Sequence, residues 1–221
     1  MADEHEIAAA STLFSDQALW ASALADRLEA GLAAALAAKP SALLAVAGGT
    51  TPGPALRALA QRALDWSRIV IAPSDERQVP PDHAARNDRM IAQALARPVS
   101  ALSALDPGAL PDVALVGFGL DRHVASVFPA GEGMAAAAAT DAAAPTIRAT
   151  TPDPLPPEAP FPRLTFTLAA LAKAEALVIA ATGAAKRAAL ANALNERPPH
   201  SPLAQLLTMR PDAAVLILDP P

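Results

Sequence analysis

The 221-residue chain contains no cysteine, which removes several kinds of protein chemistry at once. Without thiols it can form no disulfide bridge, no thiolate nucleophile and no zinc site built from cysteines. Positive charge is also scarce, because 17 basic residues stand against 22 acidic ones and the formal net charge is −5. Such a chain offers no electrostatic attraction for nucleic acid. We therefore expect neither thiol chemistry nor a nucleic-acid partner.

Targeting and membrane signals are missing as well. The first ten residues, MADEHEIAAA, are acidic and lack the basic start and apolar run of a signal peptide. No uninterrupted apolar segment reaches transmembrane length, although alanine raises the hydrophobic fraction to 52%. These absences predict a cytoplasmic protein with no membrane partner. The chain is long enough to bury a substantial core, and we expect a single domain over residues 1–221.

Short apolar runs alternate with helical patterns along the chain. The runs predict strands near 42–47, 68–72, 112–117, 164–167, 177–181 and 213–218. The patterns predict helices over 15–38, 53–63, 84–96, 122–127, 168–174 and 184–196. This alternation predicts an α/β fold with a doubly wound, mainly parallel sheet and helices on both faces. The proline-rich stretch 135–162 is predicted to be a long excursion with one strand at 145–149, and the prolines near 200 are predicted to mark another loop.

A histidine stands in the most informative window, residues 112–129. The window begins as a buried strand, continues through a turn with two glycines and then presents His123. Open α/β sheets place their active sites just beyond the carboxyl ends of strands. His123 therefore fits the role of a catalytic acid or base, since histidine commonly transfers protons at neutral pH. The alternative is an ordinary histidine in a surface loop.

A second window places a glycine-rich loop between a strand and a helix. Gly48, Gly49, Thr50 and Thr51 follow an apolar run and precede a helical pattern. Backbone N–H groups and hydroxyls at the start of a helix favour an anion, especially phosphate. The spacing is not that of a Walker loop. The alternative is a tight turn in which a threonine caps the helix.

The third window delivers charged residues at the end of an apolar strand. Asp75, Glu76 and Arg77 follow Ser74, and an arginine can hold an oxyanion with two parallel hydrogen bonds. The alternative is a solvated loop in which the two carboxylates cap a helix or pair with Arg86 or Arg89.

Taken together, these windows resemble the 6-phosphogluconolactonase family. The motifs GGTTP (48–52), DERQVP (75–80) and GFGLDRHVASVFP (117–129) stand in the order and spacing of that family. Two later segments, PRLTFTLAAL (162–171) and ATGAAKRAAL (181–190), resemble its further motifs. The related glucosamine-6-phosphate deaminases typically have Asp-Glu-Tyr in the second motif. This chain has Arg77 in place of that tyrosine and contains no tyrosine at all, which favours the lactonase.

The resemblance implies hydrolysis of 6-phospho-D-glucono-1,5-lactone in the oxidative pentose phosphate pathway. The partner is then a small-molecule phosphorylated sugar lactone, and the reaction requires no cofactor and no metal. His123 would pass a proton from water to the ring oxygen, with Asp121 or Asp75 orienting it, and backbone N–H groups near 117–119 would face the oxyanion. The residues available to hold the phosphate are Gly48, Gly49, Thr50, Thr51, Arg77 and Lys186. For Lys186, the alternative is a solvated lysine.

One residue departs from the family pattern. Arg122 occupies the position of a glycine between Asp121 and His123. Arginine fits a positive φ poorly, at a cost of about 1 kcal/mol. We expect a negative φ with the side chain pointing to solvent, the alternative being a guanidinium turned toward His123. The departure leaves open a lactonase for another phosphorylated lactone and a non-catalytic sugar-phosphate binding protein, beside an isomerase or deaminase on the same fold.

Overall fold

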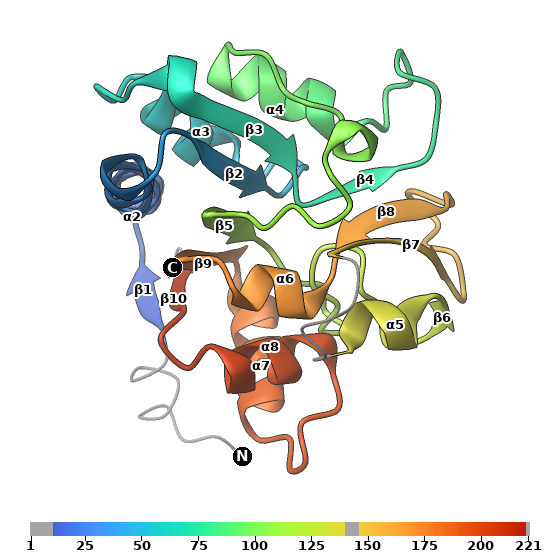
Figure 1. The fold of residues 1–221 in the computed structure, drawn as a ribbon. Coiled ribbons are helices and arrows are strands. Elements are labelled where there is room, and N and C mark those ends of the chain that lie inside the picture. The colour runs from blue at the N-terminus through green and yellow to red at the C-terminus, as the bar shows by residue number, and fades with distance from the viewer. Residues whose placement is uncertain (1–10, 140–145, 220–221) are drawn as a thin grey trace.

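The computed structural model describes residues 11–139 and 146–219. Within these ranges six strands form a sheet in the order β1-β10-β9-β5-β2-β3, and every neighbouring pair is parallel (Figure 1). The strands are β1 (Thr12–Phe14), β2 (Ala42–Val46), β3 (Ile69–Pro73), β5 (Val113–Val116), β9 (Ala176–Thr182) and β10 (Ala214–Leu218). The predicted doubly wound, mainly parallel α/β fold is confirmed.

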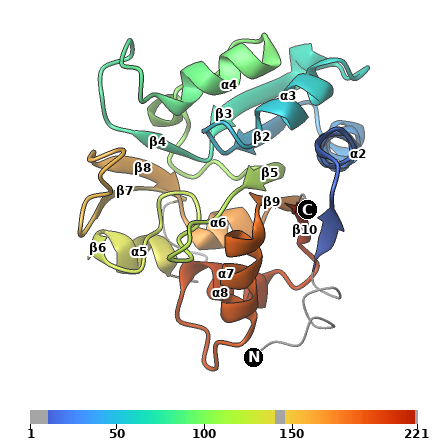
Figure 2. The same ribbon diagram turned by 180° about the vertical axis from the view of Figure 1, so that it is seen from behind.

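Helices cover both faces of this sheet (Figures 1 and 2). One face carries α2 (Gln17–Ala38), α3 (Gly53–Ala60) and α4 (Asn87–Leu95), and the other carries α6 (Leu168–Ala172), α7 (Ala184–Leu194) and α8 (Pro202–Met209). Short 3₁₀ turns lie at Trp66–Arg68 and Leu102–Ala104. None of the helices in the described ranges has the length and apolar composition that crossing a membrane requires.

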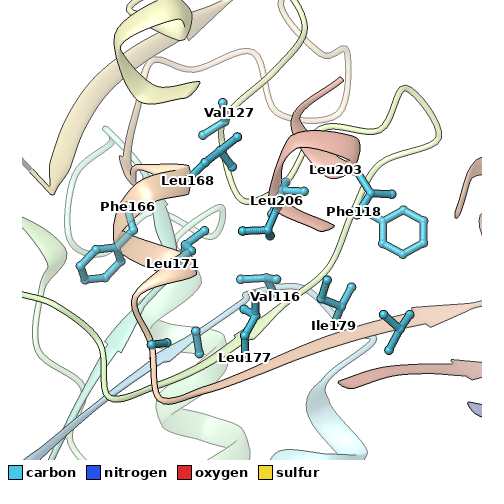
Figure 3. Packing of buried hydrophobic residues seen from close by; sticks show 14 of the residues in the cluster. Val116, Phe118, Val127, Phe166, Leu168, Leu171, Leu177, Ile179, Leu203 and Leu206 are labelled. Atoms are coloured by element: carbon cyan, nitrogen blue, oxygen red, sulfur yellow. The ribbon is translucent and has the colours of Figure 1, made fainter. Parts of the chain in front are cut away.

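Strand β5 shows why both faces must be covered. Its four residues are apolar and buried, and alternate side chains point to opposite faces. Val113 and Leu115 pack with the helices of the first face, and Ala114 and Val116 with those of the second. Figure 3 shows the second cluster, in which leucines of α6 and α8 surround Val116. Burying each of these large apolar side chains contributes roughly 1.5–3 kcal/mol.

A second, antiparallel sheet lies beside the first and corrects one expectation. It has the order β4-β8-β7-β6, with β4 (Asp75–Arg77), β6 (Gly131–Glu132), β7 (Ile147–Pro152) and β8 (Arg163–Phe166), and helix α5 (Met134–Ala138) follows β6. The run at 164–167, predicted as a strand of the parallel sheet, falls mostly in β8. The strand predicted at 145–149 overlaps β7, and its first residue lies outside the described residues. An apolar run identifies a strand but not its partner.

Two local predictions, around the histidine and around the prolines, need correction. Residues 122–127 are not helical but form a tight turn with isolated β bridges at Val124, because Arg122 and Ala125 have positive φ angles of 66° and 50°. Pro198 and Pro199 lie in a loop as predicted, but Pro202 begins α8. Pro202 stands in the first turn, where its missing N–H costs nothing, and the Ser201 side chain caps the helix.

The connections of the parallel sheet reverse direction between two neighbouring strands. From β2 the chain proceeds to β3 on one side, and from β5 it proceeds to β9 and β10 on the other. The loops at the carboxyl ends of β2 and β5 therefore diverge, and open α/β sheets bind their ligands in the crevice that this leaves. The glycine-rich loop follows β2, and the histidine loop follows β5.

Candidate active site

A cavity of about 230 Å³ opens at the carboxyl ends of β2, β3, β5 and β9. Most of the side chains and glycines singled out from the sequence line it: Gly48, Gly49, Thr51, Asp75, Arg77, His123 and Lys186. Thr50 and Asp121 do not line it directly. Two residues whose function the sequence did not assign, Asn87 and Arg163, complete its polar wall.

His123 is held by a carboxylate on its own turn. Its Nδ1 lies 2.6 Å from Oδ1 of Asp121, and its ring stacks on Phe128 with the centroids 4.2 Å apart. Burial alone would raise the pKa of Asp121, but the hydrogen bond and the charge of His123 outweigh it and hold that pKa below its ordinary value. The ionised carboxylate fixes one ring nitrogen, which leaves Nε2 for a ligand.

The other candidate carboxylate is engaged elsewhere. Asp75 is buried and accepts hydrogen bonds from the hydroxyls of Ser74 and Ser126, at 3.1 and 2.5 Å. Of the two aspartates expected to orient His123, Asp121 is therefore the one in contact with it. Asp75 lines the cavity as the first residue of β4.

The glycine-rich loop has a backbone that only glycine supplies easily. Gly49 has a φ of +86°, and a Cβ placed on it would meet nothing within 4 Å, so its main chain faces open space. A Cβ on Gly48 would lie 2.0 Å from Oδ1 of Asn87, so the loop packs directly against that amide. Helix α3 begins after Pro52 with no side-chain cap, so the alternative of a threonine cap is wrong.

Two arginines lie opposite each other on neighbouring strands of the second sheet. Arg77 of β4 and Arg163 of β8 are direct register partners, and both line the cavity. Arg77 donates from Nη1 to the carbonyl of Ala85 at 2.9 Å and to the Asn87 side chain. Arg163 is 5% exposed and donates to the carbonyl of Ala159 at 2.9 Å. The buried Nε atom of each finds no hydrogen-bond partner among the described residues.

This pair makes the cavity strongly attractive to an anion. Like charges directly opposite in an antiparallel ladder repel each other. Burial lowers the pKa of Arg163, the charge of Asp75 opposes this shift, and the neighbouring Arg77 adds to it. An anion between the guanidiniums would relieve the repulsion and could accept from the unpartnered nitrogens.

Lys186 supplies a third cation at the first turn of α7. Its ammonium donates to the carbonyl of Phe118, and it lies 5.6 Å from the centre of that ring. Burial lowers the pKa of Lys186, and the charge of Asp121 opposes the shift. The residue is partly buried in the cavity wall, so the alternative of a solvated lysine is wrong.

Comparison with known proteins places this geometry in a family. The family model of glucosamine-6-phosphate isomerases/6-phosphogluconolactonase matches residues 15–110 and 99–216. The chain belongs to this family. A 6-phosphogluconolactonase of Rhizobium meliloti is 35% identical over 212 residues, 82% of this chain and 85% of that protein. One of Pseudomonas putida is 34% identical over 223 residues, covering 88% and 86%. A crystal structure of a 6-phosphogluconolactonase from Shewanella baltica, at 24% identity, shares the fold with a TM-score of 0.81 over 95% of this chain and 97% of that one. The resemblance seen in the motifs is confirmed.

Glu76, the central residue of the family motif Asp-Glu-Arg, has a structural role. Glu76 is buried and accepts from the backbone N–H groups of Arg77, Asn87 and Asp88 at 2.8 to 2.9 Å, with Arg86 at 3.5 Å. Burial raises the pKa of Glu76, and these hydrogen bonds oppose the rise. The alternative that this carboxylate caps a helix and pairs with Arg86 is thus confirmed. Glu76 ties β4 to the start of α4 and sets the position of Asn87.

Arg122, the departure from the family pattern, does not enter the cavity. Its φ is +66°, so the expected negative φ is wrong. Its side chain runs to Glu196 beyond the end of α7, where Nε lies 3.1 Å from Oε1, instead of extending into solvent or toward His123. The backbone N–H of Gly119, expected to face an oxyanion, instead donates to the carbonyl of His123 at 2.9 Å.

Sequence reasoning missed Arg163 of the cavity wall and Ser126, which does not line the cavity but hydrogen-bonds Asp75. Arg163 had one signal: a charged residue opening the apolar, alternating strand RLTF. Such a residue is buried only when something pairs with it. Ser126 had no comparable signal within its small-residue segment. Across the described part of the chain, no group of three histidine, aspartate or glutamate side chains is placed to bind a metal ion.

Proposed function

We propose that this protein hydrolyses 6-phospho-D-glucono-1,5-lactone to 6-phosphogluconate, with His123 as general acid/base. One observation carries the proposal: a histidine oriented by a carboxylate shares a cavity with Arg77, Arg163 and Lys186. A phosphorylated lactone needs both parts, a cationic pocket for its phosphate and a proton-transfer group at its ester. Family membership with 6-phosphogluconolactonases supports the same reaction.

The proposed reaction follows from the hydrogen bond that the His123 ring makes with Asp121. With Nδ1–H donated to Asp121, Nε2 of His123 carries the lone pair and takes a proton from water. The hydroxide oxygen bonds to the lactone carbonyl carbon, and negative charge develops on the carbonyl oxygen. The bond from that carbon to the ring oxygen then breaks, and Nε2 returns its proton to the departing oxygen. The net change is addition of one water, with no group left on the enzyme.

Other polar groups of the cavity are suited to bind the phosphate. They are Gly49 and Thr51 in the loop before α3, together with Arg77, Arg163 and Lys186. The N–H of Gly119 is occupied by the carbonyl of His123, so it is not the donor for the oxyanion. Binding energy from the phosphate then fixes the reacting carbonyl near His123.

The alternatives left open by Arg122 lose the feature that favoured them. A lactonase for a different substrate, or a binding protein without activity, was suggested by an arginine beside the catalytic histidine. The side chain pairs with Glu196 instead and leaves the cavity unobstructed. The deaminase alternative still lacks its tyrosine, because Arg77 holds that position.

The test is hydrolysis of freshly generated 6-phosphogluconolactone above its spontaneous rate. We expect the wild type to accelerate it and His123→Ala to lower kcat by about 10²–10⁴-fold, with an unchanged melting temperature. His83→Ala is the matched control, because that residue is exposed on a loop and does not line the cavity. Near-normal turnover by a folded His123→Ala variant would exclude the assigned role. Binding of 6-phosphogluconate without any acceleration by the wild type would exclude the reaction.

A further inference from the structure

The turn that carries the catalytic pair contains an arginine in a backbone conformation that suits glycine. At a φ of +66°, Arg122 costs about 1 kcal/mol more than glycine would. Such strain persists only where surrounding contacts hold the residue in place. The contacts of Arg122 therefore show what fixes this turn.

Three contacts fix Arg122, and two of them lead to the same neighbouring segment. Its N–H donates to the carbonyl of Gly119 at 3.1 Å, which closes the turn on itself. Its carbonyl accepts from the N–H of Leu203 at 3.0 Å, in the first turn of α8. Its Nε lies 3.1 Å from Oε1 of Glu196, at the start of the loop joining α7 to α8. The backbone and the side chain of Arg122 thus both attach the turn to the segment that runs from Glu196 to the first turn of α8.

Glu196 is built into that loop as a fixed charge. It is 7% exposed, and its Oε2 accepts from the N–H groups of His200 and Ser201 at 3.0 and 2.7 Å. Burial would raise the pKa of Glu196, but the hydrogen bonds from Ser201 and His200 outweigh it and hold that pKa below its ordinary value. Its other oxygen, Oε1, has no hydrogen bond from the described residues and faces the equally unbonded Nε of Arg122. The contact is therefore an ion pair between two atoms that no described residue hydrogen-bonds, while the His200 ring lies 3.3 Å from Oε2 of the same carboxylate.

We propose that Arg122 is a positioning residue, whose ion pair with Glu196 holds the turn of Asp121 and His123 in its catalytic geometry. Asp121 precedes Arg122 and His123 follows it, so any rotation of the Arg122 backbone moves both members of the 2.6 Å pair. The inference rests on the proposed function, because it assigns His123 the proton transfer. Neither Arg122 nor Glu196 lines the cavity, so the pair acts on the histidine and not on the substrate.

The test uses four variants of the full chain: Arg122→Gln, Glu196→Gln, the double variant, and Arg122→Lys. Arg122→Gln and Glu196→Gln should each lower kcat about three- to tenfold, and the double variant no further than the stronger single change. KM should change less than twofold, because no substrate contact is removed. Arg122→Lys should recover part of kcat, because it keeps the charge. The control is Arg187→Gln, which removes a different ion pair, that of Arg187 on α7 with Asp219 at 3.3 Å, and should leave kcat unchanged.

A second readout does not depend on turnover. The ¹⁵N resonances of the His123 ring report whether Nδ1 keeps its proton toward Asp121, and they should shift in Arg122→Gln and in Glu196→Gln but not in Arg187→Gln. Unchanged ring resonances, unchanged kcat, or strictly additive effects in the double variant would each overturn the positioning role.

The two proposals fail in distinguishable ways. Loss of activity in His123→Ala with normal activity in Arg122→Gln overturns only the positioning role. Full activity in His123→Ala overturns the proposed function, and the assignment of a catalytic geometry to this turn falls with it.

Discussion

Adding a single methyl group at Gly119 should separate the side chains of Asp121 and His123. A Cβ built there would lie 2.2 Å from Oδ1 of Asp121 and 2.2 Å from Nδ1 of His123. The backbone of Gly119 is not in the left-handed region, so alanine can adopt its conformation without strain. The substitution therefore pushes the two side chains apart and leaves the backbone conformation unchanged.

The size of the displacement sets the size of the effect. Ordinary contact begins near 3.4 Å, so each atom must retreat by about 1.2 Å if neither backbone moves. Both atoms are at the ends of side chains, and the carboxylate is 48% exposed, so the fold can absorb the movement. A misplacement of about 1 Å in a catalytic group can cost about 10²-fold in rate. Gly119→Ala should lose kcat on that scale and keep most of its thermal stability.

Gly108→Ala is the matched control, on an exposed turn outside the cavity. There a Cβ would meet only Oδ1 of Asp106, at 3.2 Å, and that exposed side chain can rotate away. Lactone hydrolysis and melting temperature should be measured for both variants. The control should stay within about threefold of wild type, well below the ~10² expected for a misplaced group. Equal kcat in the two variants would show that the Asp121–His123 contact does not govern the reaction.

Two further predictions concern the cations of the cavity. Arg163→Met should weaken binding of 6-phosphogluconate by roughly 10- to 150-fold in titration calorimetry, since a charge-assisted contact contributes about 1.5–3 kcal/mol. The control is Arg97→Met, which should bind normally, because the guanidinium of Arg97 stacks on Trp66 at 4.1 Å. Equal affinities of the two variants would contradict the role of Arg163. Burial lowers the pKa of Lys186 from 10.5, so affinity for 6-phosphogluconate should be full at neutral pH and fall as pH rises, beginning below the pH at which a free lysine titrates. Lys186→Arg should abolish that alkaline loss. An identical pH profile in this variant would contradict the role of Lys186.

The parallel sheet could be predicted because its strands are apolar on both sides. β2, β5 and β9 read as short apolar runs, and the helices between them fix the direction of each strand. The same reasoning located much of the site, since the carboxyl ends of parallel strands share one edge of the sheet. His123 and the glycine-rich loop were found in this way, by their position after β5 and β2.

The second sheet could not be predicted, because its pairing is non-local and its strands are short. β4 consists of three residues, all charged, and β6 of only two residues, Gly131 and Glu132. β4 pairs with β8, which lies more than eighty residues further along the chain. No periodicity in three residues reveals such a partner, so the position of Arg163 in the cavity stayed hidden. The predicted helix over 122–127 failed for a related reason, since tertiary contacts of the turn hold Arg122 at a φ that its residue type disfavours.

The pairing of β4 with β8 forms part of the cavity wall. Register places Arg77 opposite Arg163, although like charges in that position repel. A sheet selected for stability alone would carry a neutral or oppositely charged partner there. The buried carboxylate of Asp75 offsets only part of the repulsion, and the two Nε atoms keep hydrogen-bonding capacity that the described protein groups do not use. An anion between the two guanidiniums would reduce this repulsion and accept from the two Nε atoms, so the pairing favours a negatively charged ligand in the cavity.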